Sequence, residues 1–263
     1  MDGQERLSRR IRSQSLEAVV LRRTDWGEAD RLLVLYTREQ GKLRAIAKGV
    51  RKMRSRKAGH LEPFTHVKML LARGRDIGII TQAEAIDLNQ TLREDIMLAS
   101  CASYVVELLD RFTAEEGPNR ALFRLLLESL DRLGSGFSTS LVLRYYEMRL
   151  LDLAGYRPQL FNCTNCKNEI KPQDQYFSAG RGGAVCPDCR PLIADARPVS
   201  ETALKYLRHF QRSAFPDAAR AKPTPAASRE MEKLMGDYLT YVLERELNSP
   251  AFIRRARENS QLR

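Results

Sequence analysis

Four of the five cysteines form two closely spaced pairs, a pattern typical of metal sites. Cys163 and Cys166 make one CxxC pair and Cys186 and Cys189 make the other, with 19 residues between the pairs. Each CxxC turn can direct two thiolates toward one point, and four thiolates at about 2.3 Å around Zn2+ leave no open position for water. The spacing therefore predicts one structural zinc ion, which stabilises a segment too small to have its own core.

Other uses of cysteine pairs fit this pattern less well. A redox CxxC motif needs one pair beside a βαβ unit rather than two symmetric pairs. Iron–sulfur proteins also use four thiolates, but their usual clustered spacings are absent from this sequence. A catalytic zinc ion is disfavoured because all four positions around the ion are already filled. Cys101 stands apart in an apolar helical pattern, and we expect it to be a small buried side chain.

A second chemical signal is a run of positive charge. Residues 42–57, KLRAIAKGVRKMRSRK, carry eight Lys or Arg side chains and no acid. Residues 1–82 contain 19 basic and 9 acidic side chains, whereas residues 83–263 contain 25 and 24, so the N-terminal third carries +10 of the net charge of +11. Charge that served only solubility would be spread evenly. The asymmetry indicates a polyanion-binding module joined to a neutral scaffold.

We predict that these cations bind nucleic-acid phosphates without reading bases. Phosphate contacts supply most of the affinity for nucleic acid and make it sensitive to salt. Trp26, Tyr36 and Phe64 are candidates for stacking on bases, although we expect Tyr36 and Phe64 to be core residues instead. The predicted phosphate-binding residues are Arg31, Lys42, Arg44, Lys48, Arg51, Lys52, Arg54, Arg56 and Lys57.

The remaining polar residues indicate no active site. We expect surface or packing roles for the three histidines, His60, His66 and His209. The Gly-rich turn GRGG at residues 180–183 is not followed by GK[ST], so it is not a phosphate-binding loop. The acids of DWGEAD, residues 25–30, are expected to cap and turn the chain. The sequence therefore predicts a binding protein rather than an enzyme.

Strand patterns surround the basic run. Five short apolar-rich segments occupy residues 16–23, 30–37, 42–49, 66–73 and 76–84. Alternation is clearest in KLRAIAK, where Leu43, Ala45 and Ala47 point one way and the charged side chains point the other. Five consecutive strands over about 70 residues suit a small closed barrel, because closure removes the sheet edges. An OB-fold fits this strand count, and an SH3-like barrel fits nearly as well.

Helical patterns follow, and the cysteine segment interrupts them. The fold class is therefore α+β: an N-terminal five-stranded OB-type β-barrel and a C-terminal all-α helical domain with an inserted four-cysteine zinc-binding segment. No run of about 18 apolar residues and no secretory signal is present, so we expect a soluble, cytoplasmic protein without a membrane partner. The predicted parts are a disordered basic extension (1–14), the barrel (15–84), the first helical part (85–159), the zinc segment (160–192), and the second helical part with a basic tail from residue 250 (193–263).

Several motifs resemble one bacterial family closely. They are D-x-G-E-x-D-R-L at residues 25–32, T-x-E-x-G-K-L-x-A-I-A-K-G at 37–49, and R-K-x-x-S-R at 51–56 with L-x-P-F after it. LLDLAGYRPQLFNCTNC and LERELNSPAF extend the resemblance toward the C-terminus. Over roughly residues 15–255 the chain resembles the RecO family of DNA repair and recombination proteins.

The resemblance implies a recombination mediator that breaks no bonds. Members bind single- and double-stranded DNA, anneal complementary strands and work with RecR and RecF. They help to load RecA onto DNA coated by the single-strand binding protein SSB, whose acidic-hydrophobic tail the helical domain can receive. It also implies an OB-fold, a helical domain and a zinc-binding insertion, and action at the bacterial nucleoid during repair. Not every member keeps four cysteines, but this chain does.

Two hypotheses from other classes remain open. A basic barrel with a zinc segment also suits an RNA-binding protein of the ribosome or transcription machinery. A nuclease is the second alternative, because the acids of DWGEAD offer carboxylates for Mg2+.

Overall fold

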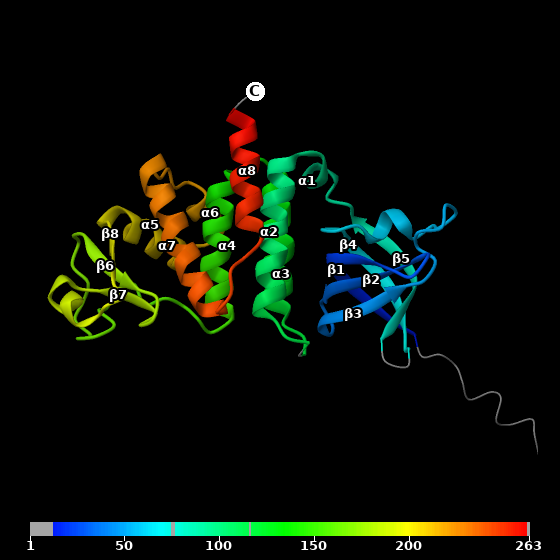
Figure 1. Ribbon diagram of the computed structural model, residues 1–263, viewed down its shortest axis with the longest axis horizontal. Helices are drawn as coiled ribbons and strands as arrows, with labels where there is room; N and C mark the ends of the chain where they lie inside the picture. The colour runs from blue at the N-terminus through cyan, green and yellow to red at the C-terminus, as the bar shows by residue number, and fades with distance from the viewer. Residues whose placement is uncertain (1–12, 75–76, 116, 262–263) are drawn as a thin grey trace, which may run out of the picture. The chain divides into compact units, whose positions relative to one another are not determined.

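The computed structural model describes residues 13–74, 77–115 and 117–261 (Figure 1). The chain divides into two compact units. The first comprises residues up to 94 together with 113–127, and the second comprises 95–112 together with the chain from 128 onward. Of the predicted disordered extension, residues 1–12 lie outside the described residues. Residues 13 and 14 already belong to the first strand.

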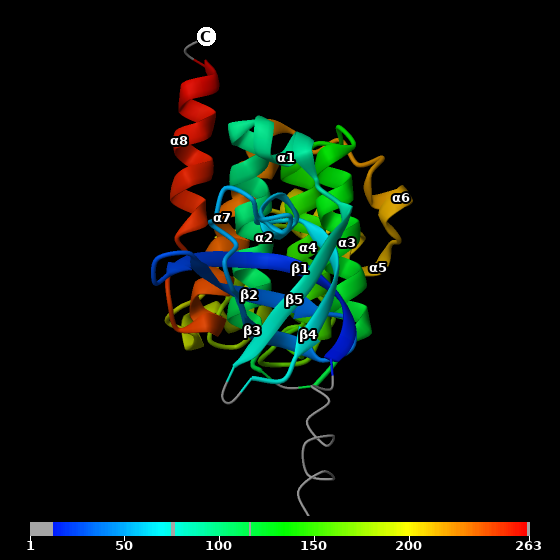
Figure 2. The ribbon, with the colours of Figure 1, turned by 90° about the vertical axis from the view of Figure 1, so that its right-hand side faces the viewer.

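The first unit contains a five-stranded closed barrel. Its strands follow one another around the ring in the order β1-β2-β3-β5-β4, and Figure 2 shows the barrel facing the viewer. The parallel seam between β3 and β5 has only two residue pairs, whereas the other seams are longer and antiparallel. The predicted OB-type barrel is confirmed. Its strands are β1 (Ser13–Trp26), β2 (Asp30–Thr37), β3 (Gly41–Ala47), β4 (His66–Ala72) and β5 (Gly78–Asp87).

Period-two alternation explains the barrel core. Leu16, Ala18 and Val20 alternate along β1 and are all buried, and the register then shifts at a bulge after Val20. On β3, Ala45 and Ala47 are buried as predicted, Leu43 packs partly buried against the same core, and Arg44 on the opposite face is exposed. The barrel interior is therefore apolar, and its basic side chains are available on the outside.

The second unit is mainly helical. Asp95 ends one helix and starts the next, because its carboxylate accepts hydrogen bonds from two backbone N–H groups that follow it. Asn119 caps another helix, because its side-chain oxygen accepts from two N–H groups. The helices of the chain are α1 (Gln90–Glu94), which belongs to the first unit, α2 (Ile96–Phe112), α3 (Arg120–Gly134), which begins in the first unit, α4 (Thr139–Leu153), α5 (Glu201–Arg212), α6 (Phe215–Ala218), α7 (Pro225–Leu243) and α8 (Ser249–Gln261).

Of the predicted basic tail from residue 250, the described residues, up to 261, belong to α8. Ile253 and Ala256 are buried, and α8 packs against α2. The Glu107 carboxylate of α2 accepts hydrogen bonds from the backbone N–H groups of Asn248 and Ser249. A negative charge at a helix N-terminus stabilises the helix, so α8 depends on a residue far away in the sequence.

A buried polar network joins α2 to α4. The Glu147 carboxylate accepts hydrogen bonds from the Arg144 guanidinium at 2.5 Å and from the Tyr104 hydroxyl at 2.6 Å. Burial disfavours the charged carboxylate and raises the pKa of Glu147 to about 7, although Arg144 opposes this shift. These three side chains therefore fix the packing of the two helices through charge as well as through apolar contact.

The cysteine segment forms a small sheet of its own. β6 (Gln175–Ser178) pairs with both β7 (Gly183–Val185) and β8 (Arg197–Val199), and β6 and β7 form a hairpin around the Gly-rich turn. A 3-10 helix, η3 (Pro187–Leu192), follows β7. The segment is bound to α5 and α7: Gln211 donates to the Pro158 carbonyl, and Tyr238 contacts the Phe177 ring edge-on.

Candidate nucleic-acid interface and metal centre

The loop at residues 48–57, called the basic loop below, leaves the end of β3 and is fixed to the β1–β2 hairpin (Figure 1). The backbone N–H of Gly49 donates to the Asp30 carboxylate at 2.7 Å, and that of Arg51 donates to the Ala29 carbonyl at 2.9 Å. Gly49 has a φ of +63°, which favours glycine at this turn. The hairpin and the basic loop therefore form one surface at this end of the barrel.

The structure brings five of the predicted cations together on the basic loop. All five are exposed, and within the described part of the chain one of them, Arg51, forms an ion pair, with Asp25 at 3.4 Å. Exposed cations on one short loop can meet several phosphates at once without first losing strong partners within the protein. The five residues are Lys48, Arg51, Lys52, Arg54 and Arg56.

Arg31 and Lys57 lie in the same region but have different surroundings. The Arg31 side chain is 16% exposed and lies between the carboxylates of Asp25 and Glu62, at 3.2 and 3.1 Å. Lys57 Nζ donates to the carbonyl oxygens of Ile80 and Lys48 at 2.9 and 3.3 Å, and burial lowers the pKa of Lys57. Lys57 holds the end of the basic loop against β5, whereas the partners of Arg31 lie outside that loop. Both cations already have partners within the protein.

Lys42 and Arg44 lie on β3 rather than on the basic loop. Lys42 Nζ donates to the Thr113 carbonyl at 2.6 Å, and Arg44 forms an ion pair with Glu115, also at 2.6 Å. The Arg44 side chain is still 59% exposed, so its ion pair with Glu115 lies open to solvent. A phosphate that binds Arg44 would have to compete with Glu115. Phosphates that bind the basic loop would not face this competition.

Of the three candidate aromatics, only Trp26 is exposed. Tyr36 and Phe64 are 2% and 7% exposed and belong to the core, as expected. Trp26 is 52% exposed at the end of β1. Met53, in the middle of the basic loop, is fully exposed, and the sequence analysis did not name it as a candidate contact. The one sign of it in the sequence is that it is an apolar residue inside a run of cations.

Two of the three acids of DWGEAD, Asp25 and Asp30, have structural partners. Asp25 pairs with Arg31 and Arg51, and Asp30 accepts the Gly49 N–H. Among the described residues, the one group of three or more metal-ligating side chains is formed by the four cysteines. These contacts fix the β1–β2 hairpin and the basic loop.

The sequence also contains one pattern that is typical of zinc deaminases, and the structure gives its residues other partners. His60-Leu61-Glu62 has the H-x-E form that zinc deaminases combine with P-C-x-x-C. His60 accepts a hydrogen bond from the Ala85 N–H, and Glu62 pairs with Arg23 and Arg31. Neither side chain belongs to the group of cysteines, so these residues do not make a deaminase centre.

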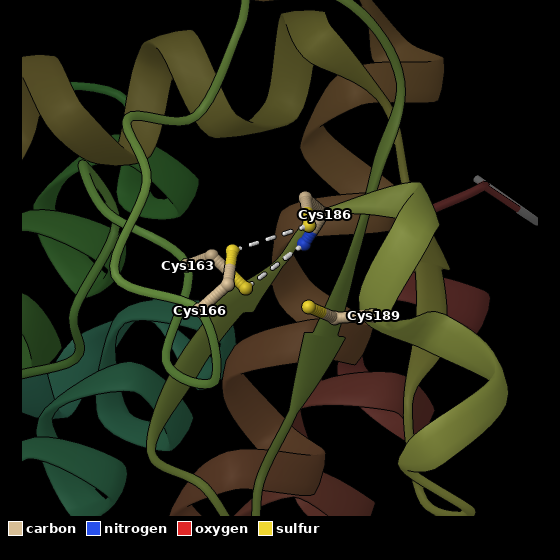
Figure 3. Close-up of side chains that lie close together, drawn as sticks. All are labelled: Cys163, Cys166, Cys186 and Cys189. Carbon is tan, nitrogen blue, oxygen red and sulfur yellow. Dashed lines mark hydrogen bonds between the residues drawn. The ribbon is translucent and has the colours of Figure 1, made fainter.

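The four cysteines converge on one point (Figure 3). Their sulfur atoms all lie within 4.8 Å of one another, and the Sγ atoms of Cys166 and Cys186 are 3.7 Å apart. A tetrahedral site with Zn–S bonds of about 2.3 Å requires sulfurs about 3.8 Å apart. The four thiols therefore fit a zinc ion, and they leave no ligand position for a substrate.

Backbone N–H groups at this centre stabilise the negatively charged thiolate of Cys163. Burial alone would raise the pKa of Cys163, but N–H groups of Cys186, Cys166 and Asn165 lower it to about 6. Asn165 also donates to the Cys189 sulfur at 3.4 Å. In contrast, burial raises the pKa of Cys186 to about 12. A bound cation supplies the charge that all four thiolates need together.

Comparison with known proteins gives consistent matches along the chain. A family model described as "Recombination protein O N terminal" matches residues 12–89, and another described as "Recombination protein O C terminal" matches residues 93–251. A DNA repair protein RecO from Roseiflexus sp. (strain RS-1) is 41% identical over 244 residues, which are 93% of this chain and 86% of the relative.

More distant relatives carry the same name. A DNA repair protein RecO from Dehalococcoides mccartyi (strain ATCC BAA-2266 / KCTC 15142 / 195) is 38% identical over 229 residues, covering 87% of this chain and 90% of the relative. One from Bacillus pumilus (strain SAFR-032) is 33% identical over 222 residues, covering 84% and 86%. Among the described residues, no helix has the length and apolar character needed to cross a membrane.

Proposed function

The chain belongs to the RecO family of DNA repair and recombination proteins, and from this premise we propose that it is a recombination mediator. It binds single- and double-stranded DNA without sequence preference and anneals complementary strands. With RecR and RecF it helps to load RecA onto SSB-coated DNA. We expect it to act in the bacterial cytoplasm, at the nucleoid during repair.

The observation that carries this proposal is the basic loop. Five exposed cations on one loop, with a further exposed guanidinium on β3, suit phosphates spaced along a strand. Two DNA strands repel each other, and annealing requires that this repulsion be screened. A basic surface provides the screening without forming or breaking a bond, so the proposed activity needs no catalytic residue.

The proposed phosphate-binding set includes all nine predicted cations, with unequal roles. The exposed side chains of the basic loop make the principal contacts. Lys42 and Arg44 extend the surface along β3, Lys57 contributes mainly by fixing the basic loop, and Arg31 contributes least because two carboxylates already hold it. We rank the cations by exposure and by the hydrogen bonds and ion pairs that each already makes within the protein.

We propose that the four cysteines hold one structural Zn2+. The supporting observations are the sulfur spacing, the N–H groups directed at sulfur, and the small size of the segment. Cys163, Cys166, Cys186 and Cys189 are the proposed ligands. The ion would stabilise residues 160–192 and would take no part in DNA chemistry.

The proposed protein partners come from the family and not from a mapped surface. RecR and RecF are proposed as direct partners, the C-terminal tail of SSB as a ligand of the helical unit, and RecA as an indirect partner. The relatives are named as repair proteins rather than as enzymes. The structural roles of Asp25 and Asp30 also favour a protein without nuclease activity.

Competition between nucleic acids separates this proposal from its rivals. We expect labelled single-stranded DNA bound to the full chain to be displaced by unlabelled DNA of the same sequence at least as well as by RNA. Incubation with Mg2+ should leave the DNA uncut. Displacement by RNA at a concentration ten times lower than that of DNA would favour the RNA-binding alternative, and Mg2+-dependent cleavage would favour a nuclease.

A further inference from the structure

The chain contains a single tryptophan, and the structure leaves it exposed. Trp26 ends β1 with 52% of its surface in contact with solvent. A single exposed apolar residue is ordinary on a protein surface. Trp26 is different from the other exposed aromatics because it lies in the β1–β2 hairpin, to which the basic loop is hydrogen-bonded.

Backbone contacts hold the end of β1 next to the basic loop. Trp26 pairs with Asp30 across the hairpin, and Asp30 accepts the Gly49 N–H at the start of the basic loop. The Arg51 guanidinium donates to the Gly27 carbonyl, one residue after Trp26, at 3.3 Å. The strand register and these two hydrogen bonds therefore hold the backbone at Trp26 close to Arg51 and the start of the basic loop.

An exposed indole beside exposed cations matches the chemistry of an unpaired nucleic-acid strand. The cations meet the phosphates, and the aromatic ring offers a face on which a base can stack. In a duplex both faces of each base are covered by neighbouring bases, so a duplex offers phosphates but no free base face. An apolar protein partner fits less well, because the surrounding side chains are charged.

We propose that Trp26 stacks on a base of the bound strand and gives the basic loop a preference for unpaired strands over duplex. This inference rests on the proposed function, because it assumes that the basic loop binds DNA phosphates. It adds a contact to the bases, where the phosphate-binding residues alone would treat both forms of DNA alike.

Since Trp26 is the one tryptophan in the chain, its fluorescence reports on this contact directly. We expect a thymine oligonucleotide to quench the fluorescence of the full chain as it binds. An abasic strand of the same length carries the phosphates without the bases, and it should bind without comparable quenching. Duplex DNA should likewise bind with little quenching.

Two substitutions complete the test. Trp26→Ala should weaken binding of the thymine oligonucleotide about 5- to 150-fold, which corresponds to one stacked base at about 1–3 kcal/mol. Trp26→Phe, which keeps an aromatic face, should retain most of the affinity. Losses for the abasic strand and the duplex should stay within about twofold.

The outcomes separate this inference from the proposed function. Equal losses on all three DNA forms, or quenching as strong with the abasic strand as with thymine, would overturn the stacking role while leaving phosphate binding intact. Failure of the unmodified chain to bind any DNA form would instead overturn the proposed function. If Trp26→Ala does not fold, the quenching experiment and Trp26→Phe still decide.

Discussion

Reversal of Arg51, Lys52, Arg54 and Arg56 to Glu abolishes DNA binding while leaving the fold intact. The four side chains are exposed, so their replacement removes no core contact, and surface substitutions usually change stability by less than about 0.5 kcal/mol. Each lost phosphate contact should also reduce the magnitude of the slope of log affinity against log salt by about 0.9, so binding becomes less sensitive to salt. The reversed loop repels the DNA backbone instead of neutralising it.

A salt series measured by fluorescence anisotropy checks this result. The matched control reverses four exposed cations of the helical unit, Arg229, Lys233, Arg245 and Arg254, and makes the same change in formal charge. The control should retain most of the affinity, and circular dichroism should show both variants folded. Affinity that is unchanged in the loop variant, or reduced equally in both variants, contradicts the account.

Removal of zinc unfolds the cysteine segment and leaves the barrel intact. The segment has only short strands and a 3-10 helix, so the ion replaces the core that the segment lacks. Cys163→Ser or treatment with a strong chelator should therefore remove protection from hydrogen exchange across residues 160–192. Protection of the barrel strands and affinity of the basic loop for DNA should change little.

Metal analysis gives the direct check. We expect one zinc ion per chain in the purified protein and a loss of that ion in Cys163→Ser. Cys101→Ala is the matched control, because Cys101 is buried in α2 and lies outside the group of four sulfurs. Protein purified without bound metal, or a segment that stays protected after the ion is removed, would show that the assignment is wrong.

The barrel could be predicted from the sequence because its signal is local. Alternation in KLRAIAK places Ala45 and Ala47 inside and Arg44 outside, and the structure agrees. The metal site of the four cysteines could also be predicted, because the CxxC spacing alone brings two sulfurs together. In both cases the signal is local, because it lies within one strand or within each CxxC pair.

The features that were missed depend on contacts between distant residues. Residues from 250 onward have a basic composition that suits a tail, but Glu107 caps α8 and α2 buries Ile253. In the same way, Lys57 looks like its neighbours in the sequence, yet it donates to the Ile80 carbonyl on β5. Charge is visible in a sequence, but whether a charge is already engaged depends on the fold.

Strand annealing on SSB-coated DNA tests the central claim most directly. Two complementary strands coated with SSB are mixed with the unmodified chain or with the variant that carries Glu at positions 51, 52, 54 and 56. The account predicts that the unmodified chain anneals the strands well above the spontaneous rate and that the variant does not. An unmodified chain that leaves the spontaneous rate unchanged, or a variant that anneals equally fast, would contradict it.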